Sequence, residues 1–206
     1  MKLKLQTQII SVVLIAGIAV SLVGSAYLWG KPLIEKRATI SEYLKAENFI
    51  LELDKKITEI SNTGSGEASI DIPTGSLKLI NYQANDPKNN TLILQFLVDQ
   101  PMLLGEAVPI KTSSLGEIGI YGESEPRIIF LNSTGRGEKY LLSLELHYRE
   151  LDTQTTPSKG YKIVLDGYNS MGKEKVMISF DKNEVVPGGA ANGGDLVLTH
   201  IRINLY

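Results

Sequence analysis

Residues 9–29 read IISVVLIAGIAVSLVGSAYLW, and none of these twenty-one residues carries a charge. As an α-helix rising about 1.5 Å per residue, the stretch would be roughly 31 Å long, close to the ~30 Å hydrocarbon core of a bilayer. Eleven of its side chains are large and aliphatic, and leaving them in water would cost on the order of 20 kcal/mol. We therefore expect this segment to lie in lipid, to lie in a bundle of similar helices, or to be removed by cleavage.

Small residues recur along one side of this apolar stretch. Gly17, Ser21 and Ser25 are spaced four residues apart, and Gly24 lies beside them. In apolar surroundings, such a stripe of small residues allows two helix backbones to approach closely. These four residues are the candidate helix-packing and assembly residues, although glycine and serine are also common in membrane spans that have no such role.

Residues 31–64 predict a second helical stretch, which is amphipathic. Gly30 and Pro32 predict a kink or a brief interruption before it, because proline cannot donate a backbone hydrogen bond. One apolar line then follows helical spacing and comprises Tyr43, Ala46, Ile50, Leu53, Ile57 and Ile60. A second line runs beside it and comprises Leu33, Ile40, Leu44 and Leu51. We expect this wide apolar face to pack on the protein's own domain and also to contact neighbouring subunits.

The remaining residues, 65–206, predict one β-rich domain. Apolar and polar side chains alternate strictly in residues 142–149, which is typical of an antiparallel strand with one face in water. Similar patterns predict strands over residues 68–72, 76–80, 92–98, 107–111, 117–121, 127–131, 161–165, 176–180 and 197–205. About ten strands in a domain of this size indicate a β-sandwich or a barrel-like sheet. The predicted fold class is therefore α+β, a long N-terminal α-helix followed by an antiparallel β-sandwich head.

Composition excludes several classes of function. The 206 residues include no cysteine, so disulfides, thiolate nucleophiles and cysteine-based metal sites are absent. The net charge is −2, from 21 basic and 23 acidic residues, which gives no reason to expect nucleic acid as a partner.

No pattern in the chain points to catalysis. His147 and His200 fall on the polar sides of predicted strands, so we expect both at the surface and neither as a metal ligand. Residues 181–184 only faintly resemble the start of a calcium loop and are expected to form a turn in solvent. We expect no enzyme activity, no cofactor, no metal and no small-molecule substrate. Asn89 and Asn132 begin glycosylation sequons on predicted turns, which is compatible with a domain outside the cell.

The N-terminus resembles that of archaeal type IV pilin-like proteins, including relatives of archaellins. Lys2 and Lys4 match the short basic leader of that family, Gln6 matches the first mature residue, and residues 9–29 match the apolar helix that follows. The layout is also similar, with one long helix before one β-rich head. Leu5 departs from the pattern, since the family usually has Gly or Ala before the cleavage point.

The resemblance implies a leader at 1–5, a transmembrane and filament-core helix at 6–30, an amphipathic helix at 31–64 and an extracellular head at 65–206. It implies cleavage between Leu5 and Gln6 and assembly with copies of itself or related pilins into a surface filament for adhesion. Four alternatives remain open: a single-span anchored head that binds a surface partner or glycan, an accessory pilus component, an exported hydrolase, and a secreted domain cleaved near residues 24–26.

Overall fold

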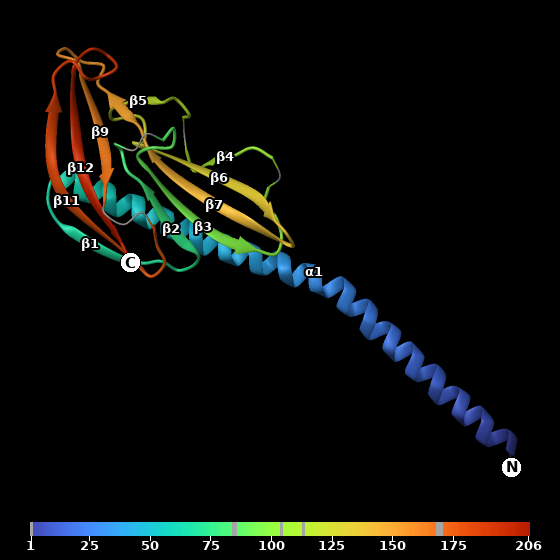
Figure 1. Ribbon diagram of the computed structural model, residues 1–206. Helices are drawn as coiled ribbons and strands as arrows, with labels where there is room; N and C mark the ends of the chain where they lie inside the picture. Colours follow the sequence, from blue (N-terminus) through green and yellow to red (C-terminus); the bar gives the residue numbers. More distant parts are fainter. Residues whose placement is uncertain (1, 84–85, 104, 113, 168–170) are drawn as a thin grey trace.

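The chain folds into one very long helix and a β-rich head (Figure 1). The computed structural model describes residues 2–83, 86–103, 105–112, 114–167 and 171–206. Within these residues, helix α1 (Lys2–Thr63) is followed by strands that form two six-stranded sheets. The predicted α+β class, with an N-terminal helix and a β-sandwich head, is confirmed.

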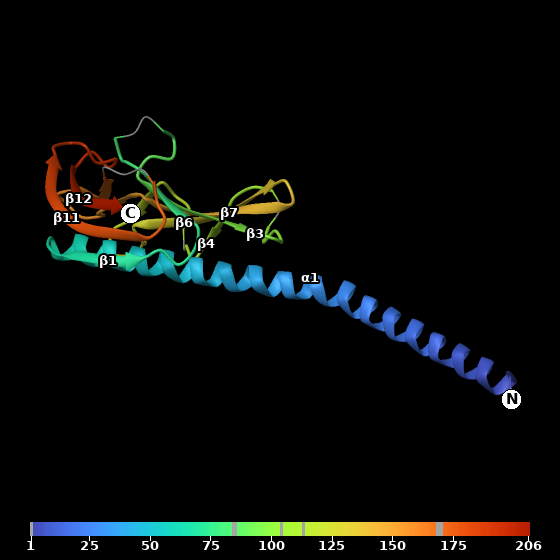
Figure 2. The same ribbon diagram turned by 60° about the horizontal axis from the view of Figure 1, so that its bottom comes forward.

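Helix α1 runs without a break through Pro32. Of the predicted kink or brief interruption, the interruption does not occur, and the helix axis changes direction where α1 leaves the head (Figure 2). A proline removes one hydrogen bond and bends a helix, and strongly helical sequence on both sides keeps it continuous. The helix ends as expected at Gly64, which has a positive φ of 62° and donates its amide to the carbonyl of Ile60 at 3.0 Å.

The first sheet has the strand order β1-β11-β12-β9-β8-β5. Its strands are β1 (Glu67–Asp71), β5 (Ile118–Ile120), β8 (Glu150–Asp152), β9 (Lys159–Asp166), β11 (Lys175–Val186) and β12 (Asp195–Leu205). Most neighbours are antiparallel, but β12 pairs with β9 and β5 pairs with β8 in parallel. This sheet is therefore mixed, whereas the alternation in the sequence predicted only antiparallel pairs.

The second sheet has the order β10-β2-β3-β7-β6-β4, and all its pairs are antiparallel. Its strands are β2 (Ser76–Ile80), β3 (Thr91–Val98), β4 (Val108–Ile110), β6 (Arg127–Arg136), β7 (Lys139–Tyr148) and β10 (Met171–Gly172). The hairpin of β6 and β7 turns at Gly137, which has a positive φ of 63°. Residues 133–135, predicted as a turn, are therefore part of β6.

One hydrophobic core joins the helix to both sheets. The C-terminal half of α1 lies along one side of the head (Figure 2). Ile50, Leu53 and Ile57 of α1 are at most 1% exposed and share a core with Leu94 of β3 and Ile203 of β12. The first apolar line of the amphipathic segment thus packs on the head as predicted.

Two short strands and one long one differ from the sequence prediction. Strands β8 and β10 are too short to show alternation, so the pattern missed them. Residues 181–184, predicted as a turn, lie in β11, which continues to Val186 beside β12. Their polar side chains are exposed, and the register with β12 shifts between Phe180 and Lys182, so this part of the strand resembles a turn in composition.

Candidate functional site

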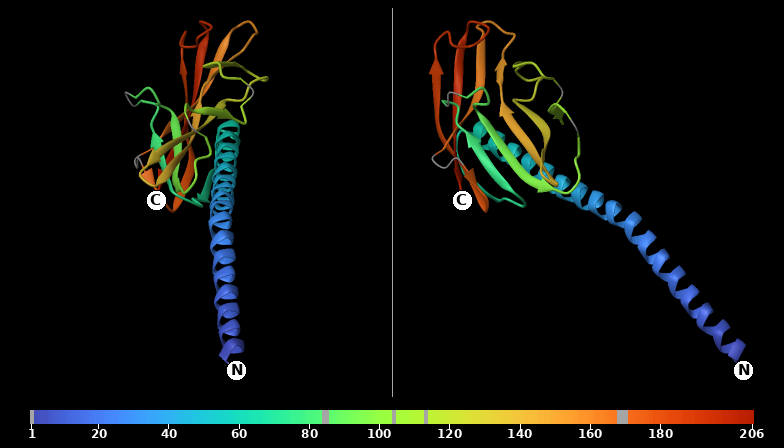
Figure 3. Two further views of the ribbon diagram at one scale, coloured as in Figure 1. Left: turned by 90° about the vertical axis from the view of Figure 1, so that its right-hand side faces the viewer. Right: turned by 45° about the vertical axis from the view of Figure 1, so that its right-hand side comes forward.

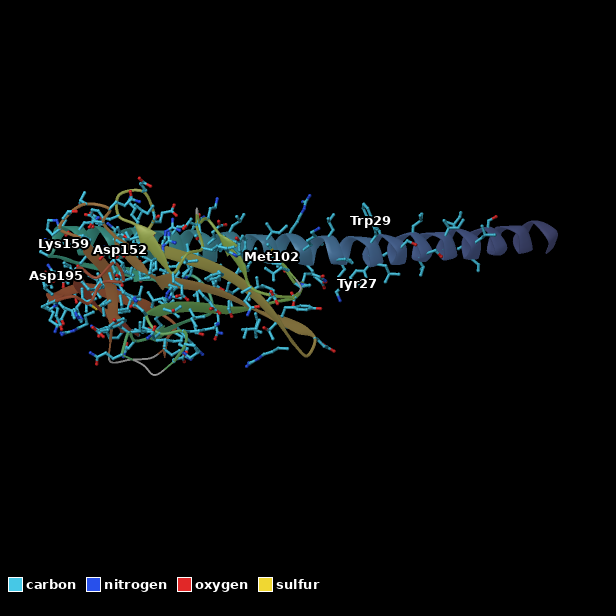
Figure 4. All side chains as sticks on the ribbon, turned by 90° about the horizontal axis from the view of Figure 1, so that it is seen from above. Tyr27, Trp29, Met102, Asp152, Lys159 and Asp195 are labelled. Atoms are coloured by element: carbon cyan, nitrogen blue, oxygen red, sulfur yellow. The ribbon has the colours of Figure 1, made fainter. Side chains whose placement is uncertain are left out.

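The N-terminal half of α1 extends away from the head, and the side chains described there, from residue 11 on, project freely on all sides (Figure 4). Between Val12 and Ile34 the large apolar side chains are 46–80% exposed. Exposed apolar area of this extent marks a surface that lipid or another protein covers. By length and composition, α1 is able to cross a membrane.

The small-residue stripe lies on this free half. A Cβ atom added at Gly17 or Gly24 would meet nothing within 4 Å. The hydroxyl of Ser21 donates to the carbonyl of Gly17 at 2.9 Å, so its polar group is satisfied within its own helix. The stripe therefore presents a flat surface, with Ser25 one turn farther along, on which a second helix can lie closely.

Two aromatic residues mark the head-side end of the apolar run. Tyr27 and Trp29 project from opposite sides of α1 (Figure 4) and are 64% and 80% exposed. Lys31 follows Trp29 by two residues. Tyr and Trp gather where a span meets the headgroup layer, and basic residues extend beyond them, so this end of the run has the composition of a membrane interface.

Most of the second apolar line of α1 remains exposed beyond this point, although Leu51 packs against the core of the head. Leu33, Ile40 and Leu44 are 46%, 38% and 49% exposed. They lie on the part of the helix that adjoins or packs against the head, but they face away from the head's core. The contact with neighbouring subunits stays a prediction, since the structure contains a single chain.

A polar contact fixes α1 to the second sheet. The buried hydroxyl of Tyr148 donates to Asp54 Oδ1 at 2.9 Å, and Arg127 forms an ion pair with Asp54 Oδ2. Burial raises the pKa of Asp54, an effect that the positive charge of Arg127 opposes. Burial and the nearby Asp54 carboxylate raise the pKa of Tyr148 well above its ordinary value. Because its pKa is raised, the phenol of Tyr148 keeps its proton and donates a hydrogen bond to Asp54, and this contact stabilises the docked helix.

His200 is buried, contrary to the prediction of a surface histidine. Only 5% of it is exposed, and its Nδ1 lies 2.8 Å from Asp166 Oδ2. Leu196 and Leu198, on the same side of β12, are buried in a second apolar cluster that covers the outer face of this sheet.

His147 is partly buried, with Nδ1 3.1 Å from the hydroxyl of Thr91. Among the described residues, no group of three or more His, Asp or Glu side chains is placed to hold a metal ion.

A cleft opens at the other end of α1, farthest from the N-terminus. Strands β9, β11 and β12 continue past the last turn of the helix (Figure 3). A cleft of about 440 Å³ lies between one face of these strands, the end of α1 and the loop after β5. Tyr121 and Tyr161 face each other there with ring centroids 4.6 Å apart. Neither tyrosine was singled out from the sequence, because they are forty residues apart and only the strand pairing brings them together.

The remaining predicted sites are scattered. Asn89 precedes β3 and is half-buried, and Asn132 lies within β6 and not on a turn. Leu5 and Gln6 lie in the first turns of α1. None of these residues approaches the stripe or the cleft.

Comparison of the chain with protein-family models, with curated proteins and with solved structures gave no match.

Proposed function

We propose that the protein is a structural subunit of an extracellular, type IV pilus-like filament that serves surface attachment. Residues 6–30 lie in the membrane before assembly and in the filament core afterwards. The head, residues 65–206, forms the outer surface. The partners are copies of the same chain or related pilins.

The observation that carries this proposal is the uncovered apolar line beyond the span. Leu44 follows Trp29 by fifteen residues, or about 22 Å along a helix. If Trp29 marks the edge of the hydrocarbon core, Ile40 and Leu44 lie well outside the lipid. A head anchored by one span would leave these side chains in water, whereas a neighbouring helix in a filament would cover them.

The free half of α1 is suited both to lipid and to a bundle of similar helices. Moving it from lipid into a bundle of similar helices exchanges one apolar medium for another, so little hydrophobic free energy is gained. Specific association then depends on close packing. Gly17, Ser21, Gly24 and Ser25 supply the flat surface that close packing requires.

The double variant Ile40→Gln with Leu44→Gln separates the filament from the single-span anchor. Both side chains are partly exposed in the subunit, so the head should fold and the span should insert as before. We expect filaments in negative-stain images of cells to be lost or greatly reduced. The control is Glu52→Gln, an exposed position on the same helix. Normal filaments from the double variant, or no filaments from the wild type, would favour an anchored head.

The mature N-terminus gives a second test. Mass spectrometry of filaments should find Gln6 as the first residue. A chain beginning near Tyr27 would instead indicate a secreted domain and would contradict the proposal.

A further inference from the structure

The cleft beyond the end of α1 has the form of a small-molecule site. Its floor is one face of β9, β12 and β11, where Tyr161 pairs in register with Val197, and Thr199 pairs with Asn183. Its walls are the last turn of α1, with Asn62, and the loop after β5. A volume of about 440 Å³ is within the range of ~300–1,000 Å³ typical of ligand pockets.

Two tyrosines form an aromatic surface at this cleft. The rings of Tyr121 and Tyr161 are tilted by 32°, and 53% of Tyr121 is exposed. The backbone amide of Tyr121 donates to the carbonyl of Asp152 at 2.9 Å, which attaches the residue to the edge of β8. An aromatic ring held in place with one free face offers a flat apolar surface to a ligand.

A buried arginine holds the loop that carries Tyr121 in place. Arg149 is 1% exposed. Its guanidinium donates to the carbonyls of Glu125, Ser114 and Gly116 at 2.8–3.1 Å. One side chain thus ties together both ends of the loop that contains β5. The aromatic wall is therefore formed before any ligand arrives, which lowers the entropy cost of binding.

Polar groups without partners complete the lining. Within the described part of the chain, the side chains of Asn62, Asn183 and Thr199 make no hydrogen bond to protein. The two amides each offer donors and an acceptor, and the hydroxyl offers both roles. Asn183 and Thr199 are cross-strand neighbours on the floor, and Asn62 lies in the wall formed by α1, so polar groups line two sides of the cleft.

The lining carries almost no charge. Among the described residues, no carboxylate lines the cleft, and Lys162 is its one ionised residue. The ammonium of Lys162 lies 5.1 Å from the ring centroid of Tyr82, with which it makes a cation–π contact. The chemistry therefore fits a neutral ligand and gives an anionic one little attraction.

We propose that this cleft binds a neutral pyranose saccharide, a role that goes beyond filament assembly. A pyranose has an apolar face of C–H groups, which stacks on Tyr121. Its hydroxyls donate and accept hydrogen bonds, which pair with Asn62, Asn183 and Thr199. The last turn of α1, which lines the cleft, lies at the end of the helix opposite the apolar span (Figure 1), where a sugar on another surface can reach it.

Saturation-transfer NMR on the full chain in phosphatidylcholine nanodiscs tests this proposal. The probes are glucose, galactose, mannose, N-acetylglucosamine and disaccharides of each, at up to about 10 mM, a concentration that detects millimolar affinity. Because the subunits are not assembled, the result does not depend on filament formation. We expect at least one saccharide to bind the wild type and its ring C–H protons to receive the strongest transfer.

Matched variants locate the binding. Tyr121→Ala should weaken the affinity at least about tenfold, equivalent to ~1.4 kcal/mol, and Asn183→Ala should weaken it severalfold. Tyr121→Phe should bind within a few-fold of the wild type, because it keeps the ring. Tyr206→Ala, which removes another exposed tyrosine, should bind normally, and circular dichroism should show all four folded. The proposal is overturned if no saccharide binds, if Tyr121→Ala binds as tightly as the wild type, or if only short neutral peptides added as competitors bind.

Discussion

The hydroxyl of Tyr148, at the end of β7, donates a 2.9 Å hydrogen bond to the carboxylate of Asp54, in the middle of the docked part of α1. The two residues are ninety-four positions apart. Tyr148 is fully buried, so its hydroxyl has no water to replace this partner. The bond therefore ties the docking of the helix to the folding of the second sheet.

Tyr148→Phe should lower the free energy of unfolding by about 1–3 kcal/mol, because the buried carboxylate of Asp54 loses a donor. Urea unfolding of the full chain in detergent micelles, followed by circular dichroism, measures the change. Tyr206→Phe is the control, since Tyr206 is exposed at the C-terminus. Equal stability of the two variants would show that the contact contributes nothing to helix docking.

Asn90 should be among the most sensitive positions in the head. It is fully buried at a positive φ of 59°. Its amide nitrogen donates to the carbonyls of Tyr148 and Ile163, and its side-chain oxygen accepts from the amide of Leu165. One side chain thus bridges the two sheets.

Asn90→Gly accommodates the backbone angle but removes the three hydrogen bonds, and should cost roughly 3 kcal/mol or more. Asn90→Ala should cost about 1 kcal/mol beyond that, because alanine is strained at positive φ. Thermal unfolding of both variants shows which of them is less stable. A glycine variant as stable as the wild type would show that the bridge is dispensable.

His147 should make the head less stable in mild acid. Burial, together with the positive charge of Lys162, lowers its pKa below the ordinary value of 6.5. The unfolded chain therefore takes up a proton first as the pH falls. The stabilising contribution is complete above about pH 6.5 and is lost as the pH falls from there through the folded pKa.

His147→Gln should flatten the loss of stability between pH 6.5 and 5, about the range in which an unperturbed histidine titrates. Urea unfolding of wild type and variant across this range gives the comparison. Parallel curves would indicate that His147 does not couple protonation to folding.

Gly17→Leu with Ser21→Leu should abolish filaments while the subunit still enters the membrane. Leucine makes the span more apolar but fills the flat surface, so neighbouring helices are held apart. Val20→Leu with Val23→Leu is the matched control, because both positions already carry large, exposed side chains. Membrane fractionation and negative-stain microscopy together give the readout, and normal filaments from the first pair would refute a role for the stripe.

Local periodicity predicted most of the fold, because it depends on residues close in sequence. The spacing from Ala46 to Ile60 identified the face of α1 that the head buries, and the alternation through Leu142, Leu144 and Leu146 identified β7. The same alternation treated Arg149 as an outward polar residue. It is buried because the carbonyls of a loop about thirty residues earlier close over it, and no local pattern records such a closure.

The candidate sites also divide into those that a local pattern predicts and those that only the folded chain brings together. Gly17 and Ser21 are found by counting along one helix. Tyr121 and Tyr161 meet because β5 pairs in parallel with β8, which pairs with β9. His200 was misjudged because its strand face looks half-polar, whereas a second apolar cluster covers the positions before it. A site that strand pairing assembles can be predicted only when the order of the strands is known.

The unbroken course of α1 through Pro32 also has a mechanical consequence. As a subunit of the proposed filament, the protein would bear tension, and no slack linker separates its head from the free half of α1. The docked half of the helix lies lengthwise along the sheets from Thr39 to Ile60, so a pull along its axis loads that whole row of contacts together in shear. Contacts loaded together resist far more force than contacts peeled apart in turn. The joint can therefore withstand tension even though the chain has no cysteine for a covalent brace.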